Sequence, residues 1–378
     1  MRDPNTVVRP TSTEPVMVKH LNARGIQLGL PVNGNFELTA RCNFNCKMCY
    51  VHLPESAGQI FRELTADQWL SLASDAKDRG MIFTLLTGGE PMIRQDFAYI
   101  YEELVKMGLL VSVNTNLSLY NEDLRALFKK YPPSRVNVSL YGGCEGTYRQ
   151  LCGNASYEKV VGHLRSMRED GFQVRLNVSF TPYNVGDMEE IHRLSMALGL
   201  QAKAAAYMYP PVRVGGESGH NEARFEPGEA GAVMARWNAL RDTKERLIQR
   251  AERILANRAK PQTAAEPERV MCRAGRSSFW MTWDGRMMPC GTMNAEASYP
   301  LSDGFAKAWE ETRQRTADIR LPADCAVCPE RLNCHVCAAI CQCESGSFDG
   351  KPDYLCEMTR VLCEETLKAA KQAGGTEE

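Results

Sequence analysis

The chain has 378 residues, which is long for a single compact core and predicts one large domain together with a smaller one. Its content of 44% hydrophobic and 24% charged residues is typical of a folded globular protein and excludes collagen, coiled coils and disordered tails. The formal net charge of −1 gives no general positive field, so we expect no nucleic acid and no membrane surface as partners. No run of about 18 apolar residues occurs and the first ten residues lack the apolar stretch of a secretion signal, so we expect a cytoplasmic protein.

Residues 1–33 show weak periodicity and contain several Pro and Asn residues, so we expect an extended arm there. From residue 35 onward, short β-rich runs alternate with helical stretches. Thr65 and Asn121 are expected to cap helices with their side-chain oxygens, and Gly80, Gly108 and Gly171 to end helices in the left-handed conformation. The expected strands are 35–38, 81–86, 110–114, 135–140, 174–180 and 202–207, and the expected helices are 66–79, 95–106, 121–129, 157–169 and 187–197.

This alternation predicts an α/β fold with parallel strands over residues 34–210. Six such units form either a partial (β/α)6 TIM-like barrel or an open sheet, and the alternation alone does not choose between them. In both cases, functional residues lie where the strands end and the loops begin. Residues 211–268 are expected to form a loop, a long helix over 227–257 and a linker. Residues 269–378 form a cysteine-rich region that opens with a hairpin at Asp284 and Gly285.

Cysteine is the unusual feature of the composition. There are 15 cysteines, of which ten lie between Cys272 and Cys363 and three between Cys42 and Cys49. In a reducing compartment, clustered thiols more often bind metal than form disulfides. The sequence therefore predicts metal sites.

The first cluster, Cys42, Cys46 and Cys49, has the spacing C-x3-C-x2-C and directly follows the first expected strand. A structural zinc site takes four ligands, whereas three thiolates on a four-iron cluster leave one iron open for a small molecule. The second expected strand ends in Thr87-Gly88-Gly89-Glu90-Pro91 at the same edge of the sheet. The two glycines permit a close backbone approach to a ligand, and Glu90 can accept hydrogen bonds from an ammonium group.

These two segments, CNFNCKMC and TGGEP, resemble the radical S-adenosylmethionine (radical SAM) enzymes. The resemblance implies a [4Fe–4S] cluster held by the three thiolates, S-adenosyl-L-methionine on the open iron, and an electron donor such as flavodoxin or ferredoxin. It also implies that Gly88, Gly89 and Glu90 contact the methionine amino group and that Met48 lies near the adenine. Further candidate contacts to ribose or carboxylate, if they are not simply polar strand ends, are Asn114, Asn116 and Ser139.

The C-terminal cysteines resemble the SPASM extension of radical SAM proteins, which carries two auxiliary [4Fe–4S] clusters. The resemblance assigns Cys325, Cys328, Cys334 and Cys356 to an outer cluster, and Cys272, Cys290 and Cys337 to an inner one. The fourth inner ligand is Cys341, Cys343 or no side chain at all. A single zinc ion on part of this region is the alternative. Residues interpreted as ordinary side chains are Cys144, Cys152, Cys363 and His52.

Relatives with this extension mostly modify peptides or proteins, so the first hypothesis is a cross-linking or oxidising enzyme acting on a ribosomal peptide. Formylglycine formation is not expected, because Gly291 stands where the sulfatase maturases carry an Asp. The short segment before the first strand predicts no leader-binding domain, so a peptide would be recognised at the barrel mouth or by a separate protein. The alternatives are a radical SAM enzyme acting on a small molecule and a non-catalytic electron carrier.

Overall fold

The computed structural model describes residues 15–51, 53, 62–153, 156–213, 222–260 and 267–374. Its centre is an eight-stranded sheet in the order β6-β5-β4-β3-β2-β1-β7-β8. All neighbouring strands are parallel except β8, which runs antiparallel to β7. The strands are β1 (Asn33–Glu37), β2 (Phe83–Thr87), β3 (Leu110–Thr115), β4 (Arg135–Ser139), β5 (Val174–Ser179), β6 (Gln201–Ala205), β7 (Ser278–Met281) and β8 (Met287–Met288).

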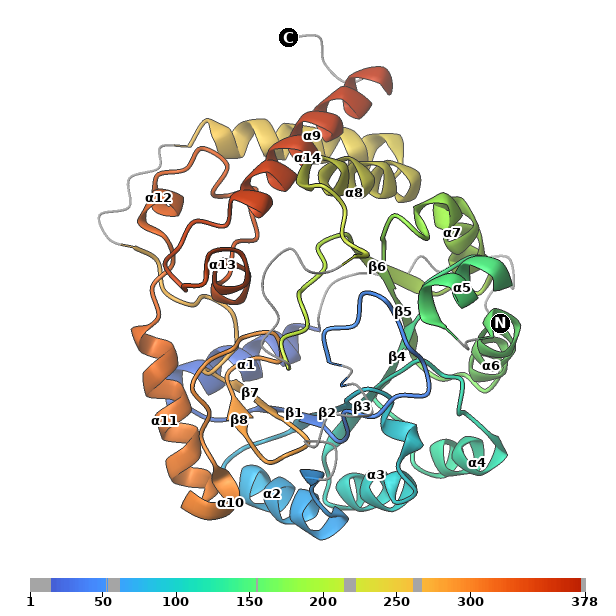
Figure 1. Ribbon diagram of the computed structural model, residues 1–378, viewed down its shortest axis with the longest axis vertical. Helices are drawn as coiled ribbons and strands as arrows, with labels where there is room; N and C mark the ends of the chain where they lie inside the picture. Colours follow the sequence, from blue (N-terminus) through green and yellow to red (C-terminus); the bar gives the residue numbers. More distant parts are fainter. Residues whose placement is uncertain are drawn as a thin grey trace.

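Helices cover the outer side of this sheet, whose strands follow an arc (Figure 1). The six strand–helix units of the expected partial barrel are confirmed, and the arc is extended past β1 by β7 and β8. The helices of the first part are α2 (Ala66–Asp78), α3 (Phe97–Lys106), α4 (Glu122–Lys130), α5 (Glu145–Cys152), α6 (Tyr157–Glu169) and α7 (Met188–Ala197), with short 3₁₀ turns η2 (Pro91–Ile93) and η3 (Val185–Asp187).

The expected helix boundaries depend on side chains that act as the sequence predicts. The Thr65 hydroxyl accepts a hydrogen bond from the Gln68 amide, and the Asn121 side chain accepts one from the Leu124 amide. Three of the helix-terminating glycines have positive φ angles of 102°, 86° and 81°, at Gly80, Gly108 and Gly171 respectively. Local sequence therefore sets these ends directly.

Two expectations about helices are wrong. The described part of the N-terminal segment is not extended, because α1 (Val16–Leu28) forms there; Gly25 lets this helix approach the chain at Val32 closely. The long helix over 227–257 is broken into α8 (Pro227–Arg241) and α9 (Lys244–Arg258), because Thr243 has extended backbone and caps the second helix. Parts of the expected loop and linker, at 214–221 and 261–266, and His52 lie outside the described residues.

The C-terminal part adds helices beside the open end of the arc (Figure 1). The last helix packs along α8, where a Cβ atom on Gly231 would come within 2.4 Å of the Met358 carbonyl oxygen. Within the described ranges, no helix is long and apolar enough to cross a membrane. These helices are α10 (Pro300–Asp303), α11 (Phe305–Asp318), α12 (Ala323–Ala326), α13 (Ala338–Ser345) and α14 (Asp353–Gln372).

The two faces of the sheet differ in polarity. Val113 and Val138 are fully buried on the face that packs against the helices. Asn114 and Asn137 are register partners on the opposite face, where the Asn137 side-chain Nδ2 donates a 2.8 Å hydrogen bond to the Asn114 side-chain Oδ1. Because successive residues of a strand point to opposite faces, the arc encloses a polar surface rather than an apolar core. Such a surface can receive a polar ligand from the strand ends.

Candidate active site

The loop that carries Cys42, Cys46 and Cys49 follows β1 and is fixed to the end of β2 by backbone hydrogen bonds. The Leu38 amide donates to the Thr87 carbonyl at 2.8 Å, and the Gly89 amide donates to the Thr39 carbonyl at 2.8 Å. The Glu90 amide donates to the Arg41 carbonyl at 2.9 Å, directly before the first cysteine. The two segments singled out in the sequence are therefore one structural unit.

Gly88 and Gly89 make this contact possible. Gly88 has a φ of 145°, and a Cβ atom there would lie 2.3 Å from the Thr39 carbonyl oxygen. A Cβ atom on Gly89 would lie 2.2 Å from the Arg41 carbonyl oxygen. The sequence explained both glycines by the approach of a ligand. The structure shows a second reason, which is that they lie against the backbone of the cysteine loop.

Glu90 is fully buried and its carboxylate is already hydrogen-bonded within the chain. Oε1 accepts from the Met92 backbone amide at 3.1 Å and from the Thr115 hydroxyl at 2.9 Å. Oε2 accepts from the Asn116 backbone amide at 2.6 Å. Burial raises the pKa of Glu90 to about 7, while these hydrogen bonds lower it. The side chain thus ties the segment after β2 to the end of β3.

Asn116 brings its side chain to the first cysteine. Its amide donates to the Asn43 side-chain oxygen at 3.0 Å and to the Cys42 sulfur at 3.7 Å. The orientation of that amide is fixed, because its oxygen accepts from the amide and the hydroxyl of Ser118 at 2.9 and 2.6 Å. Asn116 is therefore a positioned donor to a candidate ligand sulfur, a type of contact that tunes metal sites.

Cys46 lies against Cys152, a residue that the sequence interpreted as an ordinary thiol. The two thiols share a hydrogen bond, and Cys152 is fully buried at the end of α5. This helix, which the sequence analysis missed, also accepts backbone hydrogen bonds from Asn45 and Lys47 through the carbonyls of Cys152 and Leu151, both at 3.0 Å. No spacing signal links residues 46 and 152, so only folding brings them together.

The other side chains that the sequence predicted to contact S-adenosylmethionine have partners within the chain. The Asn114 amide lies 3.5 Å from the Thr87 hydroxyl, and Ser139 accepts from the Tyr141 hydroxyl at 3.2 Å. Met48 is 6% exposed and packs in the main hydrophobic core. Burial raises the pKa of the Cys42 thiol to about 12, so a metal that binds there must displace a proton.

A buried ion pair that the sequence analysis missed lies at the end of β1. Arg213 donates to the two oxygens of the Glu37 carboxylate at 3.1 and 2.6 Å, and the Trp280 indole donates to one of them at 2.6 Å. The Glu37 side chain is fully buried and that of Arg213 is 4% exposed. Nearby Tyr50 interacts electrostatically with Glu37, Cys49 and Cys290. Tyr50 therefore interacts with this ion pair and with cysteines of both groups.

Replacement of Arg213 by methionine is expected to destabilise the fold by about 3–5 kcal/mol, because it leaves the Glu37 carboxylate buried without its counter-charge. Urea unfolding followed by tryptophan fluorescence, under anaerobic conditions, measures the free energy of unfolding. The matched control is Glu364→Gln, which breaks the exposed pair with Arg360 and should leave that free energy unchanged. An equal effect of both variants would contradict the assigned importance of the buried pair.

All 15 cysteines lie in the described residues, and none forms a disulfide. The C-terminal thiols fall into two neighbourhoods by their electrostatic interactions. One contains Cys325 with Cys328, Cys334 and Cys356. The other contains Cys290 with Cys272 and Cys337.

The second neighbourhood borders a cavity of about 670 Å³. Cys272 and Cys290 line this cavity, together with Asn35 and Trp280 from the polar face of the sheet. In the parts of the chain that the structure describes, no three His, Cys, Asp or Glu side chains converge on a single metal-ion position. Two thiols therefore face this cavity.

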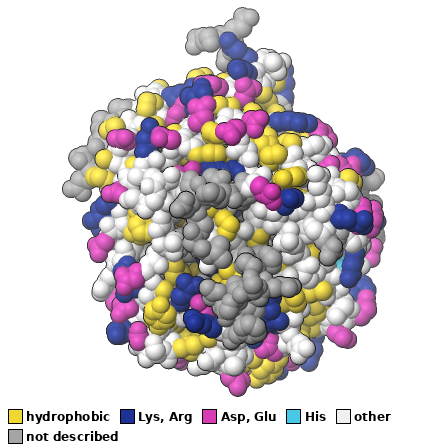
Figure 2. Space-filling view, in the orientation of Figure 1, with side chains coloured by type: hydrophobic (Ala, Val, Ile, Leu, Met, Phe, Trp, Pro, Cys, Tyr) yellow, Lys and Arg dark blue, Asp and Glu magenta, His cyan; other side chains and the backbone are white. Residues whose placement is uncertain are grey.

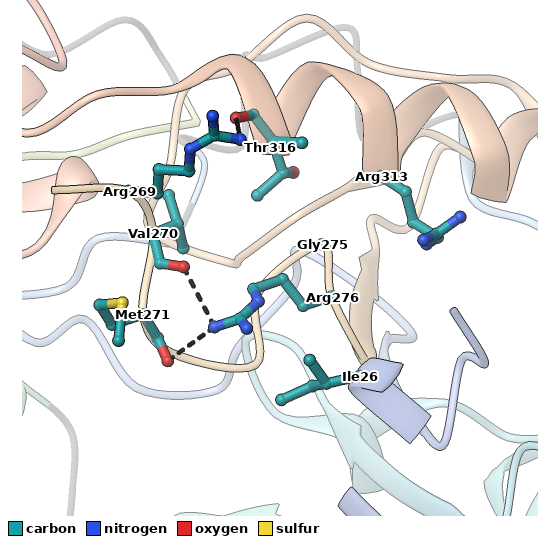
Figure 3. Close-up of a pocket in the computed structure, with 9 residues that line it drawn as sticks. Ile26, Arg269, Val270, Met271, Gly275, Arg276, Arg313 and Thr316 are labelled. Atoms are coloured by element: carbon teal, nitrogen blue, oxygen red, sulfur yellow. Dashed lines mark hydrogen bonds between the residues drawn. The ribbon is translucent and has the colours of Figure 1, made fainter. Parts of the chain in front are cut away.

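Arg276 supports the segment that carries Cys272. Its guanidinium donates to the carbonyl oxygens of Val270 at 3.2 Å and Met271 at 3.0 Å, as Figure 3 shows. The same group faces a second cavity of about 330 Å³, bounded by α11 through Thr316.

Figure 2 shows Lys and Arg side chains interspersed with Asp and Glu side chains over the visible face of the described residues.

Comparison with known proteins identifies relatives over most of the chain. The sequence profile of the radical SAM superfamily matches residues 36–195. The chain is 22% identical over 339 residues to an AdoMet-dependent heme synthase of Methanosarcina barkeri, covering 84% of this chain and 94% of the synthase. It is 30% identical over 175 residues to a probable GTP 3′,8-cyclase of Saccharolobus islandicus, covering 46% of this chain and 56% of the cyclase.

Solved structures share the fold at low sequence identity. Streptococcus suis SuiB bound to precursor peptide SuiA matches with a TM-score of 0.66 and 14% identity, covering 94% of this chain and 84% of SuiB. The protein anSMEcpe with bound AdoMet also matches with a TM-score of 0.66 and 14% identity, covering 92% of this chain and 96% of that protein. The profile match contains both the cysteine loop and the segment from Thr87 to Pro91 that the structure joins. Residues 36–195 therefore form a radical SAM domain.

Proposed function

We propose that the chain is a cytoplasmic radical SAM enzyme that abstracts hydrogen from a ribosomally made peptide or protein side chain. The product would be a thioether or carbon–carbon cross-link, or an oxidised residue. When bound, the [4Fe–4S] cluster and S-adenosylmethionine supply a 5′-deoxyadenosyl radical, after one-electron reduction by a donor such as flavodoxin or ferredoxin. The observation that carries the proposal is the fixed unit formed by the three-thiol loop and Gly88-Gly89-Glu90.

The residues present fit the cluster and its ligand. Cys42, Cys46 and Cys49 would hold three irons, and the amide of Asn116 would donate to the first of these sulfurs. Glu90 would hold the segment after β2 against the end of β3. The backbone of Gly88 and Gly89 would then stay in a fixed position beside the methionine moiety of S-adenosylmethionine. The other proposed contacts to S-adenosylmethionine are Met48, Asn114 and Ser139.

We also propose two auxiliary [4Fe–4S] clusters in residues 269–378, which we regard as a SPASM domain after the core at 34–210 and the connecting segment at 211–268. The two thiol neighbourhoods support this assignment, because each gathers cysteines distant in sequence. Iron content separates it from the zinc alternative. The proposed ligands are Cys272, Cys290, Cys325, Cys328, Cys334, Cys337 and Cys356, with Cys341 or Cys343 as a further candidate.

The peptide substrate is supported by the fold that the chain shares with SuiB, whose solved structure contains a precursor peptide. Formylglycine formation is disfavoured by Gly291, where a Cβ atom would lie 2.7 Å from the Trp280 ring. The Trp280 indole is in turn held by Glu37, so a carboxylate side chain at position 291 has no room. Recognition by a separate peptide-binding protein fits the same proposal.

A small-molecule substrate is the second candidate, because the heme synthase relative aligns with 84% of the chain. The test is anaerobic incubation of the reconstituted protein with reductant, S-adenosylmethionine and candidate precursor peptides, followed by mass spectrometry. A peptide product two mass units lighter, formed together with 5′-deoxyadenosine, supports an oxidative cross-link. Formation of 5′-deoxyadenosine without any change in candidate peptides would favour the small molecule. A protein that forms no 5′-deoxyadenosine would refute the enzymatic proposal and favour an electron carrier.

Asn116→Asp is expected to lower the rate of 5′-deoxyadenosine formation by about 10–100-fold, the usual cost of losing a supporting contact to a metal ligand. The variant keeps the oxygen that accepts from Ser118 but replaces the amide that donates to Cys42 with a second oxygen. Ser118→Ala, which leaves that amide in place, is the matched control and should have a smaller effect. Equal rates for Asn116→Asp and the parent would exclude a role for the amide.

A further inference from the structure

A buried cluster of charged and aromatic side chains lies beside Cys343 on α13. The Arg224 guanidinium donates a 2.5 Å hydrogen bond to the Glu344 carboxylate, and the Tyr207 hydroxyl donates to the same carboxylate. The Arg224 and Glu344 side chains are 7% and 8% exposed. The guanidinium also lies 3.6 Å from the centroid of the Tyr354 ring. The position of Arg224 is therefore fixed from several sides.

One N–H donor of this fixed guanidinium has no hydrogen-bond acceptor within the described residues. The Arg224 Nε atom is buried and has no hydrogen-bond partner, although its neighbouring nitrogen is paired with Glu344. A buried donor without an acceptor costs free energy, so a native protein normally supplies one. The Arg224 charge interacts electrostatically with the Cys343 thiol. The orphaned donor thus belongs to a side chain whose charge acts on a candidate sulfur ligand.

Cys341 and Cys343 cannot serve the same cluster from α13. Residues two apart on a helix are separated by about 200° around its axis, so these thiols point to nearly opposite sides. Cys341 is fully buried, and its electrostatic neighbours are Cys325 and Cys334 of the outer group and Cys337.

The Cys343 thiol has a different set of neighbours. They are Glu344, Cys337, Arg224 and Cys290, so both cysteine neighbours belong to the inner group. Of the two thiols on α13, only Cys343 therefore has exclusively inner ligands as its cysteine neighbours. The outer group already has four cysteines without Cys341.

The helix is held against the inner group by the residue between these two cysteines. Gln342 accepts from the Asn294 amide at 2.9 Å and donates to the Asn294 carbonyl at 2.6 Å. Asn294 lies four residues after Cys290, and Cys337 is the residue directly before the first turn of the same helix. The two hydrogen bonds therefore fix Cys343 relative to both Cys290 and Cys337.

We propose that Cys343 is the fourth thiolate ligand of the inner auxiliary cluster, and that Arg224 donates its free Nε–H to a sulfur of that site. The inference rests on the proposed presence of the inner cluster. As the Sγ–Fe bond forms, the Cys343 thiol releases its proton to solvent, and no electron is transferred. Arg224 is a positioning residue whose hydrogen bond to sulfur stabilises the reduced cluster and so raises its reduction potential.

The test uses a full-length background protein in which Cys42, Cys46 and Cys49 are replaced by alanine, so that only the auxiliary clusters remain. The background should contain about eight irons per chain, four for each cluster. Sodium cyanide serves as the probe for an open iron in the dithionite-reduced protein, read by electron paramagnetic resonance. The background spectrum should not respond to cyanide. Added Cys343→Ala should either make one signal cyanide-sensitive or remove four irons, whereas added Cys341→Ala should do neither.

Three outcomes would overturn the inference. They are a cyanide response of the background itself, a Cys343→Ala spectrum identical to the background, or a response produced by Cys341→Ala instead. Cys343→Ser keeps the size of the side chain and separates lost ligation from lost folding, since it should alter the signal while circular dichroism stays unchanged. Arg224→Gln should lower the potential of that cluster alone; an unchanged potential would refute the role of Arg224. A background without iron would instead refute the auxiliary clusters of the proposed function.

Discussion

Replacement of Cys42, Cys46 or Cys49 by alanine, one at a time, is expected to abolish 5′-deoxyadenosine formation. Each variant leaves two thiolates on a loop whose backbone is held by β2, one ligand fewer than the three that the proposed cluster needs. Liquid chromatography of anaerobic reactions with dithionite and S-adenosylmethionine measures the nucleoside. Iron analysis of the same samples should show a loss of about four irons per chain, one cluster.

Two controls separate a ligand effect from a general cysteine effect. Cys144→Ala removes an exposed thiol and should keep full nucleoside formation. Cys328→Ala, in the proposed outer cluster, should spare S-adenosylmethionine cleavage while reducing the modified product. If any of the three loop variants retained cleavage, the assignment of the catalytic cluster would be wrong.

Gly89→Ala is expected to lower the stability of the domain by about 1–3 kcal/mol and to reduce iron incorporation at the first cluster. The added Cβ atom would lie 2.2 Å from the Arg41 carbonyl oxygen and 2.6 Å from its carbonyl carbon. Both atoms belong to the backbone directly before Cys42, so the collision is relieved only if the cysteine loop shifts. Thermal unfolding and iron analysis of the reconstituted protein measure the two effects.

Gly162→Ala is the matched control for the same chemical change. Gly162 lies within α6, and a Cβ atom there would meet no atom within 4 Å. This variant should raise stability slightly, by about 0.5–1 kcal/mol, because alanine favours the helix. If Gly89→Ala behaved like Gly162→Ala, the close approach of the two backbones would not be a requirement of the site.

The parallel strands of the core were predictable because their signals are local. Each strand combines β-branched or other apolar residues with polar residues in alternation, and the helices between the strands carry their own caps, such as Thr65 and Asn121. The prediction was wrong where packing decides. Helix α1 contains Gly25 in its interior, and glycine disfavours a helix. The same glycine lets α1 pack closely against Val32. The break after α8 comes from the extended backbone of Asp242 and Thr243, and Thr243 caps the helix that follows.

The residue types and their spacing located the site in the sequence, but they did not reveal what each side chain does there. The sequence singled out Glu90 as a possible acceptor for an ammonium group, and the structure shows its oxygens receiving two backbone amides and a hydroxyl. The ion pair of Glu37 and Arg213 joins residues 176 positions apart, and no periodicity in a single sequence reveals such a pair.

By itself, the sequence determined the order of six strands and of five of the helices between them, the three-thiol loop after the first strand and the glycines that follow the second. These features depend on neighbouring residues, and their physics acts over a few positions of the chain. Only the tertiary structure decided that Cys152 lies against Cys46, that Asn116 donates to Cys42, and that Cys341 and Cys343 have different neighbours. Contacts of this kind join distant segments, and they are set by how the helices and loops pack around the sheet.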